Sequence, residues 1–261
     1  MLVAVNATSS HPEYSIHRDR YLQRLLRAAI AIQDEVRFVV LVSEVSAAMY
    51  SGFECQVVGG SGGKAGFMGL GGSGDVNKAV KKLKADTVLS PLQGAQEKVS
   101  VPELLFVHDL GPWEEEAAKG GVGAVDKGVK RTCAQAKSFF MPTEHLRRRC
   151  LDLFEVPLNK GIVAPPGLDP IFRTTQDTMV DLPYVVLYMS PLVAPCLAKV
   201  LAVREQLEKE LPHTIVIAGP GLAEEPVDWG GRVVRIEYLP DNHLAGLYQH
   251  GSAFIYPGLH D

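Results

Sequence analysis

Short apolar runs alternate with helical patterns along the chain, and this alternation constrains the fold more than any other feature. The runs are rich in β-branched residues and mostly continuous, which is typical of strands buried on both faces of a parallel sheet. They lie at residues 2–5, 36–42, 55–58, 87–89, 104–108, 138–141, 161–164, 184–188, 214–218, 233–236 and 253–256. Because strands and helices alternate, the sequence predicts βαβ units and therefore an α/β fold.

Apolar residues at helical spacing predict helices between these strands. The stripes are Leu22, Leu25, Leu26, Ala29 and Ile30; Val76, Val80 and Leu83 within residues 75–86; and Val122, Val125, Val129 and Cys133. Two further helices carry capping residues at their starts. Thr143 is expected to cap the helix that ends at Phe154, and Asp241 the helix that ends at His250.

A polar stretch without periodicity at residues 173–182 predicts a boundary between two domains near residue 172. The first domain, residues 1–172, would hold seven strands, and the second, residues 173–261, only four. The run at 253–256 has the composition of a central, buried strand. We therefore expect the second sheet to be truncated, with an apolar edge that favours self-association.

The composition excludes several classes of protein. A net charge of −4 provides no basic excess for binding nucleic acid. The four cysteines lie far apart, which predicts neither a disulfide framework nor a zinc site, and favours the reducing cytosol. The apolar N-terminus lacks a basic region, so it is expected to be a strand and not a signal peptide. No apolar run reaches the roughly 18 residues of a membrane span.

A series of segments in the first domain resembles a known family. KSFFMPTEHLRRRC at 137–150 reads as a strand followed by a capped helix, and it leads into GIVAPPGLDPIF at 161–172. VHDL at 107–110 places a His-Asp pair at a strand end, and the loop at 6–14 leads into a basic helix. In this order the segments resemble the acceptor-side domain of group 1 glycosyltransferases, which are retaining enzymes that use nucleotide-sugars.

The second half continues the resemblance. TIVIAGPG at 214–221, RVVRIEYLPDNHLAGLY at 232–248 and SAFIYPGLHD at 252–261 are similar to the donor domain of that family. The resemblance implies a GT-B architecture, with two Rossmann-like parallel-sheet domains and the second one truncated. The acceptor would bind the first domain and the nucleotide-sugar the second, at the carboxyl ends of the strands. The family needs no metal or cofactor, since the nucleotide-sugar is a co-substrate.

The resemblance also implies roles for individual residues. His108 would contact the transferred sugar, and Asp109 would either orient His108 or cap the next turn. Asn6 and Trp113 would lie on the acceptor side, although Trp113 could instead pin its loop. The residues implied on the donor side are Gly167, Asp169, Lys199, Gly219, Gly221, Glu237 and Asp261. Acceptors in this reading include glycans, lipid-linked sugars and small molecules.

Three interior positions depart from the family pattern. Met189 stands where the family has a glycine, Ala194-Pro195 where it has the basic pair that grips the diphosphate, and Glu237 where it has a second glycine. Lys199 is the nearest basic substitute. The lost charges would weaken stabilisation of the leaving group. The alternative is therefore a non-catalytic binding or scaffold protein of GT-B type.

Two other motifs allow either a purely structural or a functional interpretation. The glycine-rich stretch at 59–74 contains G-x-G-x-x-G, but no strand precedes this motif directly. A mobile loop near the acceptor is therefore favoured over the alternative, a dinucleotide site in an unrelated Rossmann protein. Arg147, Arg148 and Arg149 form a basic cluster on one helix. This cluster is expected to be a solvated face; the alternative is peripheral contact with the inner face of a membrane by a cytoplasmic protein.

Overall fold

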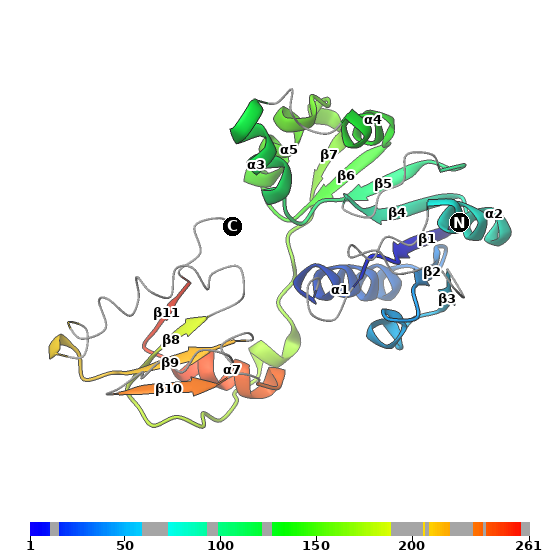
Figure 1. The fold of residues 1–261 in the computed structure, drawn as a ribbon. Helices are drawn as coiled ribbons and strands as arrows, with labels where there is room; N and C mark the ends of the chain where they lie inside the picture. Colours follow the sequence, from blue (N-terminus) through cyan, green and yellow to red (C-terminus); the bar gives the residue numbers. More distant parts are fainter. Residues whose placement is uncertain are drawn as a thin grey trace. The chain divides into compact units, whose positions relative to one another are not determined.

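The computed structural model describes residues 1–10, 16–58, 73–92, 99–121, 127–188, 206, 209–219, 232–236 and 239–256. The chain forms two compact units, Met1–Gly167 and Leu168–Asp261. Each unit contains one parallel β-sheet (Figure 1). The α/β fold with two parallel sheets that the sequence predicts is therefore the observed fold.

The sheet of the first unit has seven strands in the order β3-β2-β1-β4-β5-β6-β7, all parallel. The strands are β1 (Leu2–Ala7), β2 (Arg37–Val42), β3 (Cys55–Val57), β4 (Thr87–Pro91), β5 (Glu103–Phe106), β6 (Ser138–Met141) and β7 (Gly161–Val163). Each coincides with a predicted run to within a few residues. Strand β1 lies inside the sheet, between β2 and β4, so its carboxyl end is surrounded by loops from both sides.

Helices cover both faces of this sheet. They are α1 (Ile16–Ile32), α2 (Ser73–Leu83), α3 (Gly111–Gly120), α4 (Lys127–Gln135) and α5 (Glu144–Phe154), with short 3-10 helices η1 (Ala47–Tyr50) and η4 (Leu158–Lys160). Helix α1 packs against Val3 and Val5, whereas α2 packs against Ala4. Since alternate residues of a strand point to opposite faces, α1 and α2 cover opposite sides.

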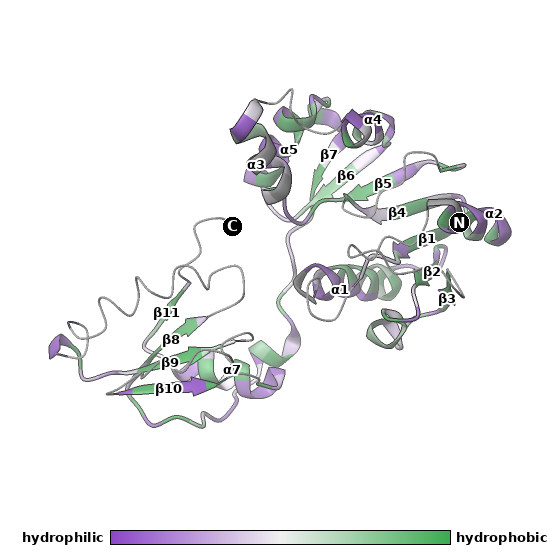
Figure 2. Ribbon diagram, viewed as in Figure 1, coloured by the Kyte–Doolittle hydropathy of each residue, from purple (hydrophilic) through white to green (hydrophobic). Residues whose placement is uncertain are grey.

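The second unit has four parallel strands in the order β10-β9-β8-β11. They are β8 (Tyr184–Tyr188), β9 (Thr214–Ala218), β10 (Val233–Ile236) and β11 (Ala253–Ile255), with the 3-10 helix η5 (Pro170–Arg173) and helix α7 (Asp241–His250). Leu247 of α7 packs with Val186 and Val216 in the core. Figure 2 shows hydrophobic residues along β8 and β9, as expected for the inner strands of the sheet.

Strand β11 forms the edge of the second sheet. The run at 253–256 has the composition of a buried central strand, but among the described strands β11 pairs with β8 alone. Phe254, Ile255 and Tyr256 are 52, 40 and 41% exposed. Among the described residues, the exposed apolar edge that the sequence predicts for a truncated second sheet is therefore observed.

Two helix predictions were tested by the contacts at the helix ends. The Thr143 hydroxyl accepts a hydrogen bond from the Leu146 amide at 3.1 Å, which confirms the predicted cap of α5. Asp241 is not the cap of α7, because Pro240 holds that position and Asp241 is the first helical residue. The fixed φ of proline favours a helix start there, and an acidic residue in the first turn stabilises the helix dipole.

The segment that precedes β8 is bound tightly to α7. The Gln249 amide nitrogen donates to the Phe172 and Thr174 carbonyl oxygens at 3.2 and 2.8 Å, and its oxygen accepts from the Gln176 amide at 2.9 Å. At Gly246 a Cβ atom would overlap the backbone of Asp177. Glycine at 246 therefore allows this segment to lie directly on the helix.

Candidate functional site

The carboxyl ends of β1, β4 and β5 meet at one edge of the seven-stranded sheet. Val5 pairs with Leu89, and Leu89 with Leu104, so the three strands are in register just before they end. Asn6 directly follows Val5 in β1, and His108 comes shortly after the end of β5. Open α/β sheets bind ligands at the carboxyl ends of their strands, so this edge is the candidate site of the first unit.

Asn6 is buried and organises the turn that follows β1. Its Oδ1 accepts hydrogen bonds from the Thr8 amide at 3.2 Å and from the Thr8 hydroxyl at 2.7 Å. The Ala7 carbonyl oxygen accepts from the Ser10 amide and from the Ser46 hydroxyl, both at 3.1 Å. These bonds fix the chain as it leaves the strand. A contact between Asn6 and an acceptor remains a prediction.

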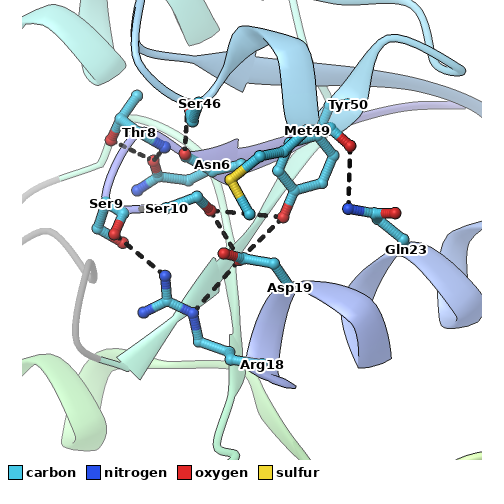
Figure 3. Close-up of polar contacts among 11 residues, drawn as sticks. Asn6, Thr8, Ser9, Ser10, Arg18, Asp19, Gln23, Ser46, Met49 and Tyr50 are labelled. Carbon is cyan, nitrogen blue, oxygen red and sulfur yellow. Dashed lines mark hydrogen bonds and ion pairs between the residues drawn. The ribbon is translucent and has the colours of Figure 1, made fainter. Parts of the chain in front are cut away.

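Asp19, in the first turn of α1, is the centre of a buried polar network (Figure 3). Its side chain is 1% exposed. One carboxylate oxygen accepts hydrogen bonds from the Ser10 hydroxyl at 2.7 Å and from the Tyr50 hydroxyl at 3.0 Å. The Arg18 Nε lies 3.5 Å from the same oxygen. Asp19 thus joins the loop after β1, helix α1 and the 3-10 helix η1.

Arg18 provides the counter-charge and a second link to the loop. Its Nη2 donates to the Ser9 carbonyl oxygen at 3.1 Å. Burial, and then the negative charge of Asp19, raises the pKa of Tyr50 far above its usual value. Tyr50 therefore stays protonated and donates to the carboxylate. A buried carboxylate with a cation and two hydroxyl donors meets the usual condition for a stable charge in the interior.

Asp19 was not predicted from the sequence, although its position carries a signal. Asp19, Leu22 and Leu26 follow one another at spacings of three and four residues, which places them on one face of α1. Leu22 and Leu26 are buried in the core. An acidic residue in line with a buried stripe needs a buried partner. That partner, Tyr50, comes from a 3-10 helix that has no pattern of its own in the sequence.

His108 and Asp109 lie where the sequence places them, directly after β5. The His108 ring is half-buried, with its centroid 6.4 Å from that of Phe106. Asp109 is exposed, and its Oδ1 accepts a hydrogen bond from the Gly111 amide at 2.9 Å. This bond closes the turn into α3, as in the capping alternative for Asp109. The catalytic roles of both residues stay predictions.

Trp113 is buried in the core of the first unit. Its ring meets that of Phe154 edge-on, with centroids 5.8 Å apart and an interplanar angle of 76°. The indole therefore packs α3 against α5. This position favours the alternative in which Trp113 pins its segment over the one in which it stacks on a sugar.

The predicted donor-side residues fall partly within the described chain. Gly167 is exposed, and Asp169 accepts a hydrogen bond from the Ile171 amide at 3.1 Å, which caps η5. Gly219 has a φ of 142°, where only glycine is unstrained, and its amide donates to the Ile236 carbonyl oxygen at 3.0 Å. Outside the described residues lie Met189, Ala194, Pro195, Lys199, Gly221, Glu237, Asp261 and most of the glycine-rich stretch, residues 59–72.

The basic cluster on α5 forms ion pairs within its own unit. Arg147 and Arg148 contact Glu144 at 2.8 and 3.1 Å, and Arg149 contacts Glu114 of α3 at 2.9 Å. The pairs support the reading of the cluster as a solvated face. Within the described part of the chain, no helix is long and apolar enough to cross a membrane. Nor do three His, Cys, Asp or Glu side chains gather there in a way that could hold a metal ion.

Comparisons with known proteins identify the architecture. No protein-family model and no curated protein matches the chain. Solved structures do match. The crystal structure of the glycotransferase of kitacinnamycin has a TM-score of 0.60 and 14% identity, over 98% of this chain and 74% of that one. Anabaena HepE, in complex with UDP and glucose, has a TM-score of 0.63 and 13% identity, over 97% and 73%. The chain has the GT-B fold.

The GT-B fold is shared by proteins of more than one activity. The UDP-GlcNAc 2-epimerase from Neisseria meningitidis, bound to UDP-GlcNAc, matches with a TM-score of 0.56 and 13% identity, over 98% of this chain and 76% of that one. At such identities the likeness establishes the fold, and the two-sheet architecture expected from the sequence is confirmed.

Proposed function

We propose that this chain is a glycosyltransferase that transfers a sugar from a nucleotide-sugar to a hydroxyl group, with retention of configuration. The observation that carries the proposal is the agreement of two independent features. The ordered segments of the sequence resemble retaining group 1 enzymes, and the two parallel sheets match GT-B structures over 97–98% of the chain.

The first unit would bind the acceptor and the second unit the donor. In the transfer, the bond between the sugar C1 and the diphosphate breaks and the nucleoside diphosphate leaves with the electron pair. The acceptor oxygen then bonds to C1 and its hydroxyl loses a proton. His108 would contact the reacting sugar, as the resemblance implies. The chemistry requires no metal ion in this proposal.

The donor side would depend on backbone groups at the end of β9. Gly219, with its φ of 142°, ends this strand without a side chain, so a phosphate or ribose could approach the backbone closely. Lys199 would supply positive charge in place of the basic pair. Gly167, Asp169, Gly221, Glu237 and Asp261 complete the proposed donor side.

A non-catalytic role in binding or assembly is the alternative. Met189 and Ala194-Pro195 favour it, because they replace the groups that stabilise the leaving diphosphate in the family that the sequence resembles. The exposed side chains of Phe254 and Ile255 on the edge strand β11, and of Tyr256 directly after it, provide a surface through which two copies of the chain could pair.

Product analysis separates these functions. The purified chain is incubated with UDP-, GDP- or ADP-glucose, and with UDP-GlcNAc, in the presence of mixed hydroxyl acceptors. Mass spectrometry then detects any glycosylated product, and proton NMR gives the configuration at C1. An α-linked product from an α-linked donor supports the proposal. Conversion of UDP-GlcNAc to its C2 epimer without transfer would contradict it, and no turnover of any donor would favour the non-catalytic alternative.

A further inference from the structure

Strand β3 is the end strand of the seven-stranded sheet, and among the described strands it pairs with β2 alone (Figure 1). The Val58 amide, directly after β3, donates to the Val42 carbonyl oxygen at 2.8 Å. Because alternate residues of a strand direct their backbone groups to opposite sides, the amide and the carbonyl oxygen of Val57 point away from β2. Backbone groups at the outer edge of a sheet can pair with a further strand.

A groove lies between this edge and helix α2. It has a volume of about 250 Å³ and is lined by residues 56–58 and by Asp75, Lys78, Ala79 and Lys82 of α2. The helix residues recur at spacings of three and four, so they belong to one face of α2. The outer edge of β3 thus forms one wall of the groove, and this helix face forms the other.

The helix wall is positively charged. Helix α2 carries Lys78, Lys81 and Lys82 but one acidic residue, Asp75, in a chain whose net charge is −4. Asp75 contacts Lys78 at 3.6 Å, whereas Lys82 makes no ion pair with any described residue. A partner that carries carboxylate groups therefore complements this wall.

The spacing of the two lysines in the groove matches that of side chains on an extended peptide. Lys78 and Lys82 are four residues apart, which is about 6 Å along a helix axis. Two residues of an extended chain span about 6.5 Å, and their side chains lie on the same side of the strand. Acidic residues at alternate positions of a peptide would therefore reach both lysines.

The residues between the acidic ones would lie on the opposite face of the sheet. Val58 packs with Val76 of α2 in the core, so Val57 turns to the other face. The Val57 side chain is 54% exposed there. An apolar side chain of the peptide beside Val57 would cover it, as cross-strand neighbours do in a sheet.

We propose that the groove between β3 and α2 binds an extended, acidic peptide segment of a partner protein as a further strand of the sheet. Main-chain hydrogen bonds with Val57 would hold the peptide, and alternate carboxylates would contact Lys78 and Lys82. The groove contains none of the residues assigned to the acceptor or the donor. The inference therefore does not depend on the proposed glycosyl transfer.

The same observations disfavour two other occupants. A small inorganic anion could contact the lysines, but it has no donor for the Val57 carbonyl oxygen. A second copy of the chain that paired through the same edge would bring two sets of lysines together, and like charges across a strand pair are destabilising.

The test is fluorescence anisotropy of a dye-labelled, end-capped hexapeptide of alternating glutamate and valine, titrated with the full chain at low salt. Because the edge is short, we expect a dissociation constant on the order of 100 micromolar. A peptide of alternating lysine and valine should bind at least about 10-fold more weakly, because the helix wall repels it.

Two modified peptides test the main-chain hydrogen bonds. One is N-methylated at its glutamates and the other at its valines, so both keep their charges. Since every second amide of an added strand faces β3, one of the two should bind about 10-fold more weakly than the unmodified peptide.

Variants of the chain locate the site. Lys82→Glu should weaken peptide binding about 5- to 10-fold, because it reverses a charge on the helix wall. The matched control is Lys81→Glu, which makes the same change on the same helix outside the lining of the groove and should alter binding less than about 2-fold. Val57→Pro removes an outward-facing amide and leaves those that face β2, so it should weaken binding about 10-fold while the chain stays folded.

The proposal is overturned if the glutamate-valine peptide does not bind the folded chain, or if Lys82→Glu binds it as well as Lys81→Glu does. It is also overturned if both N-methylated peptides bind as tightly as the unmodified one, since charge attraction alone would then account for the binding. The N-methylated peptides test the hydrogen bonds of the β3 edge even if Val57→Pro does not fold.

Discussion

Replacing Asp19 by asparagine should destabilise the first unit strongly. The asparagine has the same shape and keeps one oxygen, so it can still accept from Ser10 or Tyr50. It removes, however, the negative charge that lies 3.5 Å from the buried Arg18 among the described residues. Breaking a buried ion pair costs about 3–5 kcal/mol. Arg18 retains its bond to the Ser9 carbonyl oxygen, which places the expected loss at the low end, about 3 kcal/mol.

This loss can be measured by thermal unfolding followed by circular dichroism. For a unit of this size, Met1–Gly167, the midpoint should fall by about 6–12 °C. Tyr50→Phe removes one hydrogen bond to a charged group and should cost about 1.5–3 kcal/mol. Asp152→Asn, at an exposed position of α5, is the matched control and should stay within about 0.5 kcal/mol of wild type. An Asp19→Asn variant as stable as this control would refute the role of the network.

Three further changes test other contacts. Gly246→Ala would push a Cβ into the Asp177 backbone, and this overlap outweighs the gain in helix propensity, so chemical denaturation should show a loss of about 2 kcal/mol. Burial raises the pKa of Tyr248 from 10.0 to about 12, so its neutral form contributes stability that is lost as pH rises from 10 towards 12. In Tyr248→Phe the free energy of unfolding should therefore depend less on pH over this range. Hydrogen bonds from Arg147 lower the pKa of Glu144 from 4.5 to about 2, so the stability contributed by this carboxylate is lost as pH falls from 4.5 towards 2. In thermal scans over this range, the unfolding midpoint of Glu144→Gln should fall less with pH than that of the wild type.

The strands could be predicted from the sequence because each is a short apolar run between polar segments. The Thr143 cap could also be predicted, because the capping residue and the amide that it accepts from, that of Leu146, belong to the same short segment. The exposure of β11 depends on which strands lie beside it. Composition does not contain that information, so a run such as Phe254-Ile255 reads as buried whether the strand is central or at an edge.

The candidate site was only partly predictable. Asn6 and His108 could be placed at strand ends from the sequence because the segments around them resemble known motifs, and their roles in the site stay predictions. Asp19 and Tyr50 are 31 residues apart in the sequence, and only the fold brings them together. Sequence patterns describe periodic elements, so contacts between a loop, a helix start and a 3-10 helix lie beyond them.

The central claim is that the chain binds a nucleotide-sugar, and isothermal titration calorimetry with UDP, GDP and ADP tests it most directly. Size-exclusion chromatography beforehand establishes that the purified chain is a discrete folded species. We expect one nucleotide to bind with a dissociation constant on the order of micromolar, and its base to be the base of the nucleotide-sugar donor. A folded chain that binds none of the three would contradict the proposal that this protein is a glycosyltransferase.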